Sequence, residues 1–243
     1  MKKITLLSFS ILFSLISMAQ SSFQLGFRGT PNISWLKPDS KNVDADGAVF
    51  GFNYGVIADF NISDRYSFST GVESATTGGK LNLKDIATST EFKMKYVEVP
   101  LSLKLKTNQI GYITYYGQFG VGLGINYDAE AKFSSSLKSQ TDENFNDHIN
   151  LFRGSIIMGL GAEYNISGNT SIVFGLTFNN GVTNIFNKNG KDLIKELYQP
   201  GSAPNDQYGN YQEINLENTA KVAASDELKA ISNYLGLNIG IIF

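Results

Sequence analysis

The sequence predicts an all-β protein: an eight-stranded antiparallel up-and-down transmembrane β-barrel with short periplasmic turns and long extracellular loops. Apolar and polar residues alternate with a period of two in segment after segment. Short turns alternate with long polar connections, and the residues opposite the apolar faces are small or polar with isolated charges. An even strand count with loops sorted by length in this way is typical of outer membrane barrels.

The composition excludes several other classes of protein. The 243 residues include 24 Gly, 17 Phe and 12 Tyr, and only 17% of them are charged, which argues against disorder and coiled coils. A formal net charge of −2 gives no electrostatic footprint for nucleic acid. The absence of Cys excludes disulfides and thiolate metal sites, and a single His removes most zinc and His-dependent acid-base designs.

Residues 1–19 have the pattern of a secretory signal peptide. Lys2 and Lys3 precede an apolar run from Leu6 to Ile16, and Ser17-Met18-Ala19 supplies a small-x-small cleavage site. The alternative is an N-terminal membrane anchor, but the run is shorter than the ~20 residues that a spanning helix needs. We therefore expect residues 20–243 to form the mature protein, a single β-barrel domain.

The first four strands are predicted from alternating segments in the N-terminal half of the chain. In the second segment Phe52, Val56 and Phe60 share one face, while Asn53 and Asp59 share the other. The segments run from Phe23 to about Trp35, from Gly51 to Asn61, from Tyr66 to Ser74 and from Val97 to Leu105.

The last four strands show the same alternation in the C-terminal half. Phe119, Val121 and Leu123 alternate with glycines, and the final segment places Leu235 and Phe243 on one face. The segments run from Ile113 to Ile125, from Phe152 to Tyr164, from Ile172 to Phe178 and from Leu235 to Phe243.

The connections predict which strand ends lie on which side of the membrane. Tight turns are expected at Asn61 to Arg65, Thr107 to Ile110 and Asn165 to Asn169. Long polar loops are expected at about Leu36 to Val49, Thr77 to Glu91, Asp128 to Asp147 and Val182 to Ile231, the last as the long extracellular loop 182–231. Asp59-Phe60-Asn61-Ile62-Ser63 and Glu163-Tyr164-Asn165-Ile166-Ser167 share an acid-aromatic-Asn-Ile-Ser pattern before two of the tight turns.

A membrane barrel turns its apolar face outward, so the polar faces predict the content of the lumen. Eight strands leave just enough room for side chains, and buried charges require partners. We therefore predict that salt bridges plug the lumen and leave no open pore. The alternative is a soluble sheet, on which the same charged side chains would face water. The predicted lumen residues are Arg28, Lys104 and Arg153 with Asp59, Glu73, Glu98 and Glu163.

One strand resembles a known family. Tyr96-Val97-Glu98-Val99-Pro100-Leu101-Ser102-Leu103-Lys104 is similar to the Y-x-E-[IV]-P-L-x-[LF]-K strand of PorT-type outer membrane β-barrel proteins, with Tyr96, Glu98, Pro100 and Lys104 carrying the motif. The resemblance implies a barrel in the outer membrane of a Gram-negative bacterium, and the family's namesake is associated with type IX protein secretion. Pro100 removes one ladder donor in mid-strand, where a bulge is normally needed.

The C-terminal residue is a further candidate site. Phe243 ends a strand of alternating apolar residues and resembles the C-terminal signal that is read by the outer membrane assembly machinery. The barrel assembly machinery is therefore an expected partner during biogenesis.

The remaining motifs give no catalytic, cofactor-binding or metal site. The glycines at 117, 120, 122 and 124 are followed by more strand and not by the helix that a phosphate loop needs. His148 beside Asp147 lacks a nucleophile elbow and a placed second acid, and the acidic residues from Asp142 to Asp147 lack EF-hand spacing. We expect no cofactor.

The predicted function is that of a non-enzymatic outer membrane barrel of the PorT-like type, with extracellular loops for partner or surface contacts and a link to protein secretion. Expected partners are outer membrane lipids and an envelope or secretion-system protein, without nucleic acid. Three alternatives stay open at this point: a small-solute channel, a barrel enzyme and a soluble ligand-binding barrel.

Overall fold

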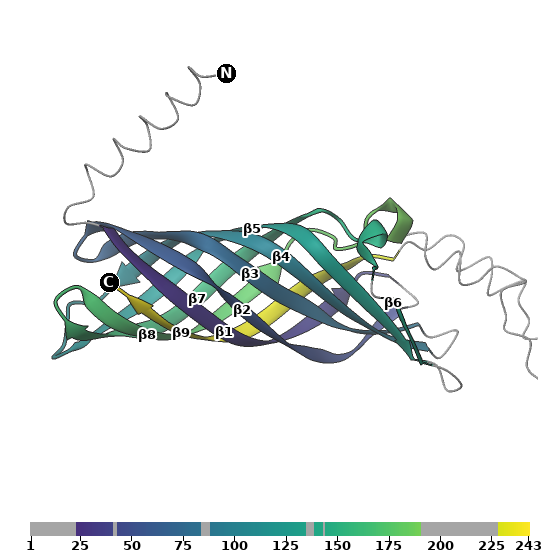
Figure 1. Cartoon of the computed structure of the whole chain (residues 1–243), viewed down its shortest axis with the longest axis horizontal. Coiled ribbons are helices and arrows are strands. Elements are labelled where there is room, and N and C mark those ends of the chain that lie inside the picture. The colour runs from purple at the N-terminus through teal and green to yellow at the C-terminus, as the bar shows by residue number, and fades with distance from the viewer. Residues whose placement is uncertain (1–22, 41–42, 84–87, 135–138, 143, 191–227) are drawn as a thin grey trace, which may run out of the picture.

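The structure is a closed antiparallel β-barrel with eight long strands (Figure 1). The computed structural model describes residues 23–40, 43–83, 88–134, 139–142, 144–190 and 228–243. The eight strands pair in chain order, β4 pairs with β5, and the last strand returns to the first. The barrel strands are β1 (Phe23–Pro38), β2 (Val43–Ser63), β3 (Tyr66–Leu83), β4 (Thr88–Lys106), β5 (Ile113–Ser134), β7 (Phe152–Ser167), β8 (Thr170–Gly181) and β9 (Ala230–Ile242).

Two short elements lie at the outer end of the barrel. β6 (Ser139–Asp142) pairs with the end of β5. The 3-10 helix η1 (Asn146–His148) follows it. None of the helices in the described part of the chain is long and apolar enough to cross a membrane.

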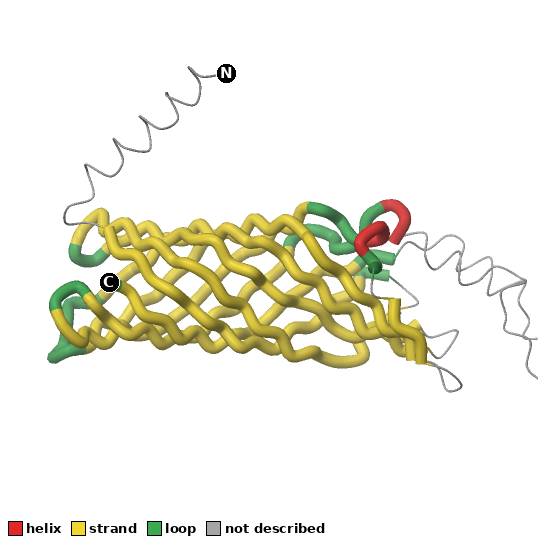
Figure 2. The backbone as a smooth tube through the Cα atoms, in the orientation of Figure 1, coloured by secondary structure: helices red, strands yellow, loops and turns green. Residues whose placement is uncertain are grey.

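The three predicted tight turns lie at one end of the barrel together with the start of β1 and the C-terminus (Figure 2). Two residues separate β2 from β3, and two separate β7 from β8. Gly168 in the second of these turns has φ +54°, a left-handed conformation that glycine adopts at little cost. This is the end that the sequence analysis assigned to the periplasm, and we call it the periplasmic end.

Three of the predicted long loops are wrong for most of their length, because the strands continue through them. β1 reaches Pro38 and β2 begins at Val43, while β3 reaches Leu83 and β4 begins at Thr88. The ladder continues in register to Leu83 opposite Thr88, and β5 continues to Ser134. A strand that has left the lipid can carry polar side chains, so polarity alone did not mark where these strands end.

The fourth predicted loop lies between β8 and β9, which end at Gly181 and begin at Ala230. Most of loop 182–231, from 191 to 227, lies outside the described residues, as does the predicted signal peptide at 1–19.

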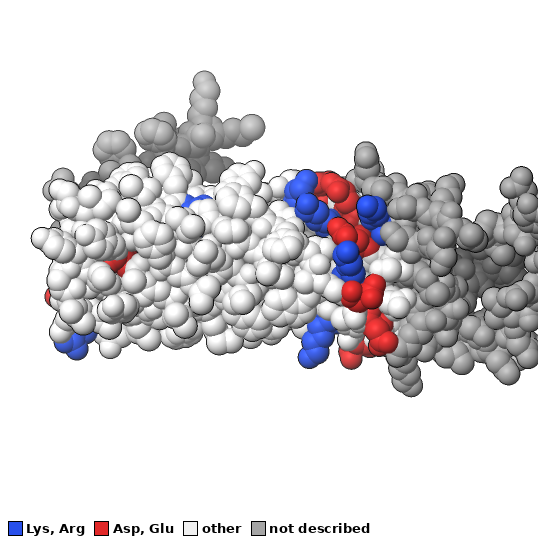
Figure 3. All heavy atoms as spheres, turned by 90° about the horizontal axis from the view of Figure 1, so that it is seen from below, with Lys and Arg blue, Asp and Glu red and all other residues white. Residues whose placement is uncertain are grey.

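The side chains are arranged as the inverted barrel requires. Phe52 and Phe174 are 52% and 49% exposed, whereas Glu98 and Arg153 are buried. On the face that Figure 3 shows, most of the length of the barrel carries few charged side chains, and a belt of Lys, Arg, Asp and Glu crosses it toward one end. The many exposed aromatic and aliphatic side chains match the apolar band of a membrane barrel and argue against the soluble-barrel alternative.

Pro100 does not cause the bulge that the sequence suggested. The β3–β4 register is the same on both sides of it, from Thr70 opposite Leu101 to Glu73 opposite Glu98. The missing N–H interrupts the ladder without shifting it, since the pairs between these two are absent. The bulge in β4–β5 lies instead between Lys95 and Tyr96.

Candidate functional site: the ion-paired lumen and its periplasmic mouth

The structure brings the seven charged residues predicted for the lumen into three ion-paired groups. Each lies on a strand face opposite the lipid-facing residues, as the period of two dictates. Six of the seven are buried, and the Arg28 side chain is 14% exposed. The pairs are Arg28 with Glu73, Arg153 with Glu98, and Lys104 with both Asp59 and Glu163.

Lys104 forms ion pairs with strands on opposite sides of the barrel. From β4 its ammonium binds Asp59 on β2 and lies 2.9 Å from Glu163 Oε1 on β7. β2 and β7 are four places apart in the ring of eight strands, so these two acids face each other across the lumen. The ammonium also lies 4.8 Å from the centre of the Tyr116 ring, which adds a cation–π contact.

Lys106 belongs to the same group, although the sequence analysis missed it. Its Nζ lies 3.1 Å from Glu163 Oε2 and donates a hydrogen bond of 3.3 Å to Asn61 Oδ1. The strand pattern could have identified Lys106, because a residue two places after Lys104 lies on the same face of the strand. With Lys106 the ion-paired groups of the lumen contain four cations and four carboxylates, so their charges balance.

The weak internal repeat has a structural counterpart. Its two acids, Asp59 and Glu163, are the two carboxylates that hold Lys104. Both copies also carry a register irregularity, between Asn61 and Ser63 and between Asn165 and Ser167. The repeated pattern therefore supplies one lumen acid and one bulged turn on each side of the barrel.

Arg153 is the centre of the second group, and it uses all of its side-chain nitrogens. Nη1 lies 2.7 Å from Glu98 Oε2, Nη2 donates to Asn179 Oδ1 at 2.7 Å, and Nε donates to Ser232 Oγ at 2.9 Å. Asn179 Nδ2 in turn donates to Glu98 Oε1 at 3.2 Å. The sequence analysis gave neither Asn179 nor Ser232 a role, because their strands are distant in sequence from Arg153.

Arg28 and Glu73 form the third group, next to the second. Glu73 lies directly opposite Glu98 in the β3–β4 register. Two like charges at directly opposed positions repel each other, and here each has its own arginine. The paired arginines therefore allow both carboxylates to remain side by side.

The four residues of the family motif form one stripe on the lumen side of β4. Tyr96, Glu98, Pro100 and Lys104 are all buried. The Tyr96 ring lies 5.7 Å from the Arg153 guanidinium, so the motif contacts both main charged groups. The neighbouring strand leaves space for it, since a Cβ on Gly122 would lie 2.9 Å from Glu98 Oε1.

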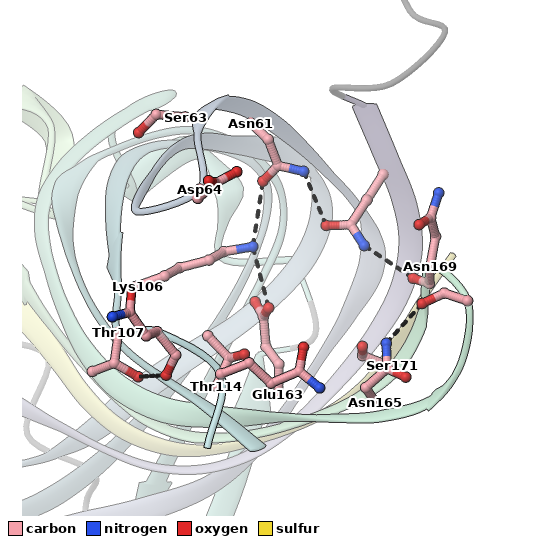
Figure 4. Close-up of a pocket in the computed structure, with 14 residues that line it drawn as sticks. Asn61, Ser63, Asp64, Lys106, Thr107, Thr114, Glu163, Asn165, Asn169 and Ser171 are labelled. Carbon is pink, nitrogen blue, oxygen red and sulfur yellow. Dashed lines mark hydrogen bonds and ion pairs between the residues drawn. The ribbon is translucent and has the colours of Figure 1, made fainter. Parts of the chain in front are cut away.

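A cavity of about 610 Å³ opens at the periplasmic end of the lumen; we call it the vestibule. Lys106, Asn61 and Glu163 form a hydrogen-bonded group in it, and the surrounding groups are mostly amides and hydroxyls (Figure 4). Its lining residues are Gln24, Asn61, Ser63, Asp64, Lys106, Thr107, Asn108, Gln109, Thr114, Glu163, Asn165, Gly168, Asn169 and Ser171.

The remaining sequence candidates lie apart from the lumen groups. The His148 ring stacks on Phe145 with ring centroids 4.4 Å apart. Within the described residues, no cluster of three or more His, Cys, Asp or Glu is placed to hold a metal ion. Phe243 is half exposed at the periplasmic rim, and its backbone N–H donates to the Leu25 carbonyl at 2.8 Å.

A family comparison agrees with this geometry. Residues 18–187 match the model of a family described as "Outer membrane protein beta-barrel domain". The chain belongs to this family. Together, the family and the architecture make this an outer membrane eight-stranded β-barrel protein. Among curated proteins none matches the barrel.

The barrel is also similar to solved structures at low sequence identity. Ail, the attachment invasion locus protein of Yersinia pestis, is 15% identical, with 91% of this chain and 99% of that chain covered and a TM-score of 0.40. The outer membrane protein OprG from Pseudomonas aeruginosa is 10% identical, with 91% and 96% covered and a TM-score of 0.46. The outer membrane protease OmpT from Escherichia coli is 8% identical, with 92% and 96% covered and a TM-score of 0.34.

Proposed function

We propose that this protein is a non-enzymatic outer membrane barrel with a sealed lumen, whose extracellular residues contact a partner or the surroundings. In this proposal the signal peptide at 1–19 directs it to the envelope of a Gram-negative bacterium. The barrel assembly machinery then inserts it among outer membrane lipids. The proposal rests on one observation above all: charged side chains bridge the lumen from strand to strand.

The ion pairs support the sealed lumen on physical grounds. An ion entering the barrel would have to displace Lys104 from Asp59 and Glu163, or Arg153 from Glu98. Breaking a buried pair leaves an uncompensated charge and costs about 3–5 kcal/mol. A pore for small solutes would have to cross two such groups in succession.

The charge balance also supports a role without catalysis. Each of the four lumen carboxylates lies against a Lys or Arg. A general acid or base needs a proton that it can exchange with substrate near the working pH, and a carboxylate held by a cation is poorly suited to this. We therefore assign the lumen residues a structural role.

The PorT resemblance supports a role beside a secretion apparatus. Its motif residues lie inside the lumen, so they support the barrel and not a partner surface. We propose that contacts to an envelope or secretion-system protein are made from the extracellular side, where the longest connection between strands lies.

Two measurements test the proposal. Reconstituted in planar bilayers, the folded protein should give no conductance steps, with a general porin inserted in the same way as the positive control. On gels the unheated protein should migrate differently from the boiled protein, as a folded barrel does. Stable open-channel currents would contradict the sealed lumen and favour the channel alternative.

The partner contact is tested with a variant in which residues 191–227 are replaced by a short Gly-Ser linker. Gentle solubilisation of envelopes followed by mass spectrometry should recover a protein that copurifies with the unaltered barrel and is lost from the variant. The variant should keep its heat-dependent gel shift. An unchanged set of copurifying proteins would contradict the role of this loop.

A further inference from the structure

The outer end of the barrel has the opposite polarity to the membrane-spanning part. On the outer part of β4 the buried side chains are those of Thr90, Phe92, Met94 and Tyr96, with exposed fractions of 1%, 2%, 0% and 1%. Glu91, Lys93 and Lys95 alternate with them on the outward face. An apolar interior with a charged exterior is the arrangement of a water-soluble protein.

In β5 a bulge produces the same change, from apolar side chains outside to apolar side chains inside. In the lipid-facing part of β5 the odd-numbered residues Leu123 and Ile125 point outward. Lys95 pairs with Asp128 and Tyr96 with Asn126, so Tyr127 is one extra residue in the strand. One extra residue moves the following side chains to the other face, and Ala129 and Ala131 are consequently buried inside.

The outward charges beyond this bulge pair with one another across strands. Lys95 Nζ lies 2.7 Å from Asp128 Oδ2, and Lys80 Nζ lies 3.3 Å from Glu91 Oε2. Figure 3 shows a belt of charged side chains toward one end of the barrel. From Tyr115 to Tyr127 the strand rises roughly 40 Å, or roughly 28 Å across a membrane at a tilt of ~45°. The ion pair of Lys95 with Asp128 therefore lies where the lipid ends.

Residues from the connecting segments close the interior of this outer end. The Phe92 ring lies 5.6 Å from the Phe145 ring and 5.3 Å from the Phe186 ring. Backbone bonds fix the segments, with Phe145 N–H donating to the Ala129 carbonyl at 2.8 Å. We call the resulting cluster the apolar cap: Leu36, Val43, Leu81, Phe92, Met94, Tyr96, Ala129, Ala131, Phe145, Ile149, Ile185, Phe186, Leu228 and Ala230.

We infer that the lumen is a cup with one opening: water and polar ligands reach it from the periplasmic vestibule, and the apolar cap closes it toward the outside. The cap is almost entirely apolar, so it offers few hydrogen-bond partners to hold water in a continuous file. The vestibule, in contrast, is lined mostly by amides and hydroxyls, together with the charged side chains of Asp64, Lys106 and Glu163. Any soluble ligand of the lumen is therefore a periplasmic one. This inference rests on the proposed sealed lumen and adds that its one opening faces the periplasm.

Single cysteines give a direct test, because the natural chain has none. Ser34 is buried on the lumen side of β1, two residues below Leu36 of the cap. Thr114 lines the vestibule, and Lys132 is exposed at the outer end. Ser34→Cys, Thr114→Cys and Lys132→Cys variants are reconstituted in liposomes, and a charged, membrane-impermeant thiol reagent is added to one side at a time.

From the extracellular side, Lys132→Cys should react at once and Ser34→Cys at least 100-fold more slowly. Thr114→Cys should react from the periplasmic side alone. Adding Phe92→Ala and Phe186→Ala to Ser34→Cys should raise its reaction rate from outside at least 10-fold. The lipid-facing substitution Phe174→Ala, as the matched control, should leave that rate unchanged.

Two results would overturn the inference. One is rapid reaction of Ser34→Cys from outside with the cap intact; the other is no effect of opening the cap in protein that keeps its gel shift. The Ser34→Cys measurement with an intact cap decides the question even if the cap variants do not fold. Reaction from outside without conductance would overturn the one-ended cup but leave the sealed lumen, whereas open-channel currents would overturn the sealed lumen itself.

Discussion

At the scale of single residues, Lys104 shows how this barrel uses charge inside a membrane. It lies between two carboxylates from opposite strands, with 3% of its surface exposed. A buried charge is tolerated only when it is paired. The burial of Lys104, Asp59 and Glu163 is therefore tolerated because of the ion pairs that these side chains form with one another.

We predict that Lys104→Met destabilises the folded barrel by about 3–5 kcal/mol, because Asp59 is left buried without a cation. The urea midpoint of unfolding in lipid vesicles measures this loss of stability, with the folded fraction read from the gel shift. Glu163 keeps Lys106 as a partner, so Asp59→Asn in the same chain should restore much of the stability.

The control for this prediction is Lys95→Met. Lys95 pairs with Asp128 on the outer surface, with 35% of its side chain exposed, and exposed pairs contribute about 0–1 kcal/mol. A loss as large as that of Lys104→Met would contradict the distinction between lumen and surface pairs.

At the scale of elements, β5 serves two environments with one strand. Below Tyr127 its apolar side chains face lipid, and above it Ala129 and Ala131 face the apolar cap. One extra residue separates the two registers. The bulge therefore sets where the membrane-spanning part ends and the water-exposed part begins.

We predict that deletion of Tyr127 prevents correct assembly of the outer end. Without the extra residue, Asp128 and Glu130 would turn toward the cap, and the alanines would turn outward. The folded, heat-modifiable fraction after refolding should fall at least tenfold. Tyr127→Ala keeps the residue count and should fold close to normally; equal folding of both variants would show that the bulge is dispensable.

At the scale of the whole molecule, the barrel has three levels along its axis. A polar vestibule lies at the periplasmic end, ion-paired groups fill the membrane-spanning part, and an apolar cluster closes the outer end. Exposed aromatic and aliphatic side chains cover the lipid-facing surface of the middle level, and the face in Figure 3 carries few charges there. The two ends of the barrel therefore differ, as expected for a protein that is inserted into the membrane in one orientation.

We predict that the protein purified from its native envelope begins at Gln20, because residues 1–19 have the pattern of a signal peptide, which is removed on export. The intact mass of the purified chain measures this directly. A mass that includes Met1 to Ala19 would contradict cleavage and favour the N-terminal anchor instead.

Strand alternation, turn sidedness and the lumen positions were all readable from the sequence, because period-two patterning is local. Phe52 and Asp59 reveal their opposite faces from spacing alone, and the seven lumen charges follow from the same rule. The extended hairpins were not recognised, because their polar residues were interpreted as loops. Yet Phe92 and Met94 alternating with Lys93 and Lys95 already carried the signal of a strand in water.

What the sequence by itself determined is the number of barrel strands, the end of the barrel at which the turns lie, and the face of each side chain within the predicted strand segments. Only the tertiary structure decided which charges meet. Lys104 finds Asp59 and Glu163 because the ring closes with β2 opposite β7. The closing of the outer end by Phe145 and Phe186 is equally nonlocal. Such partners depend on how strands far apart in sequence are brought together, which residue spacing along one strand does not encode.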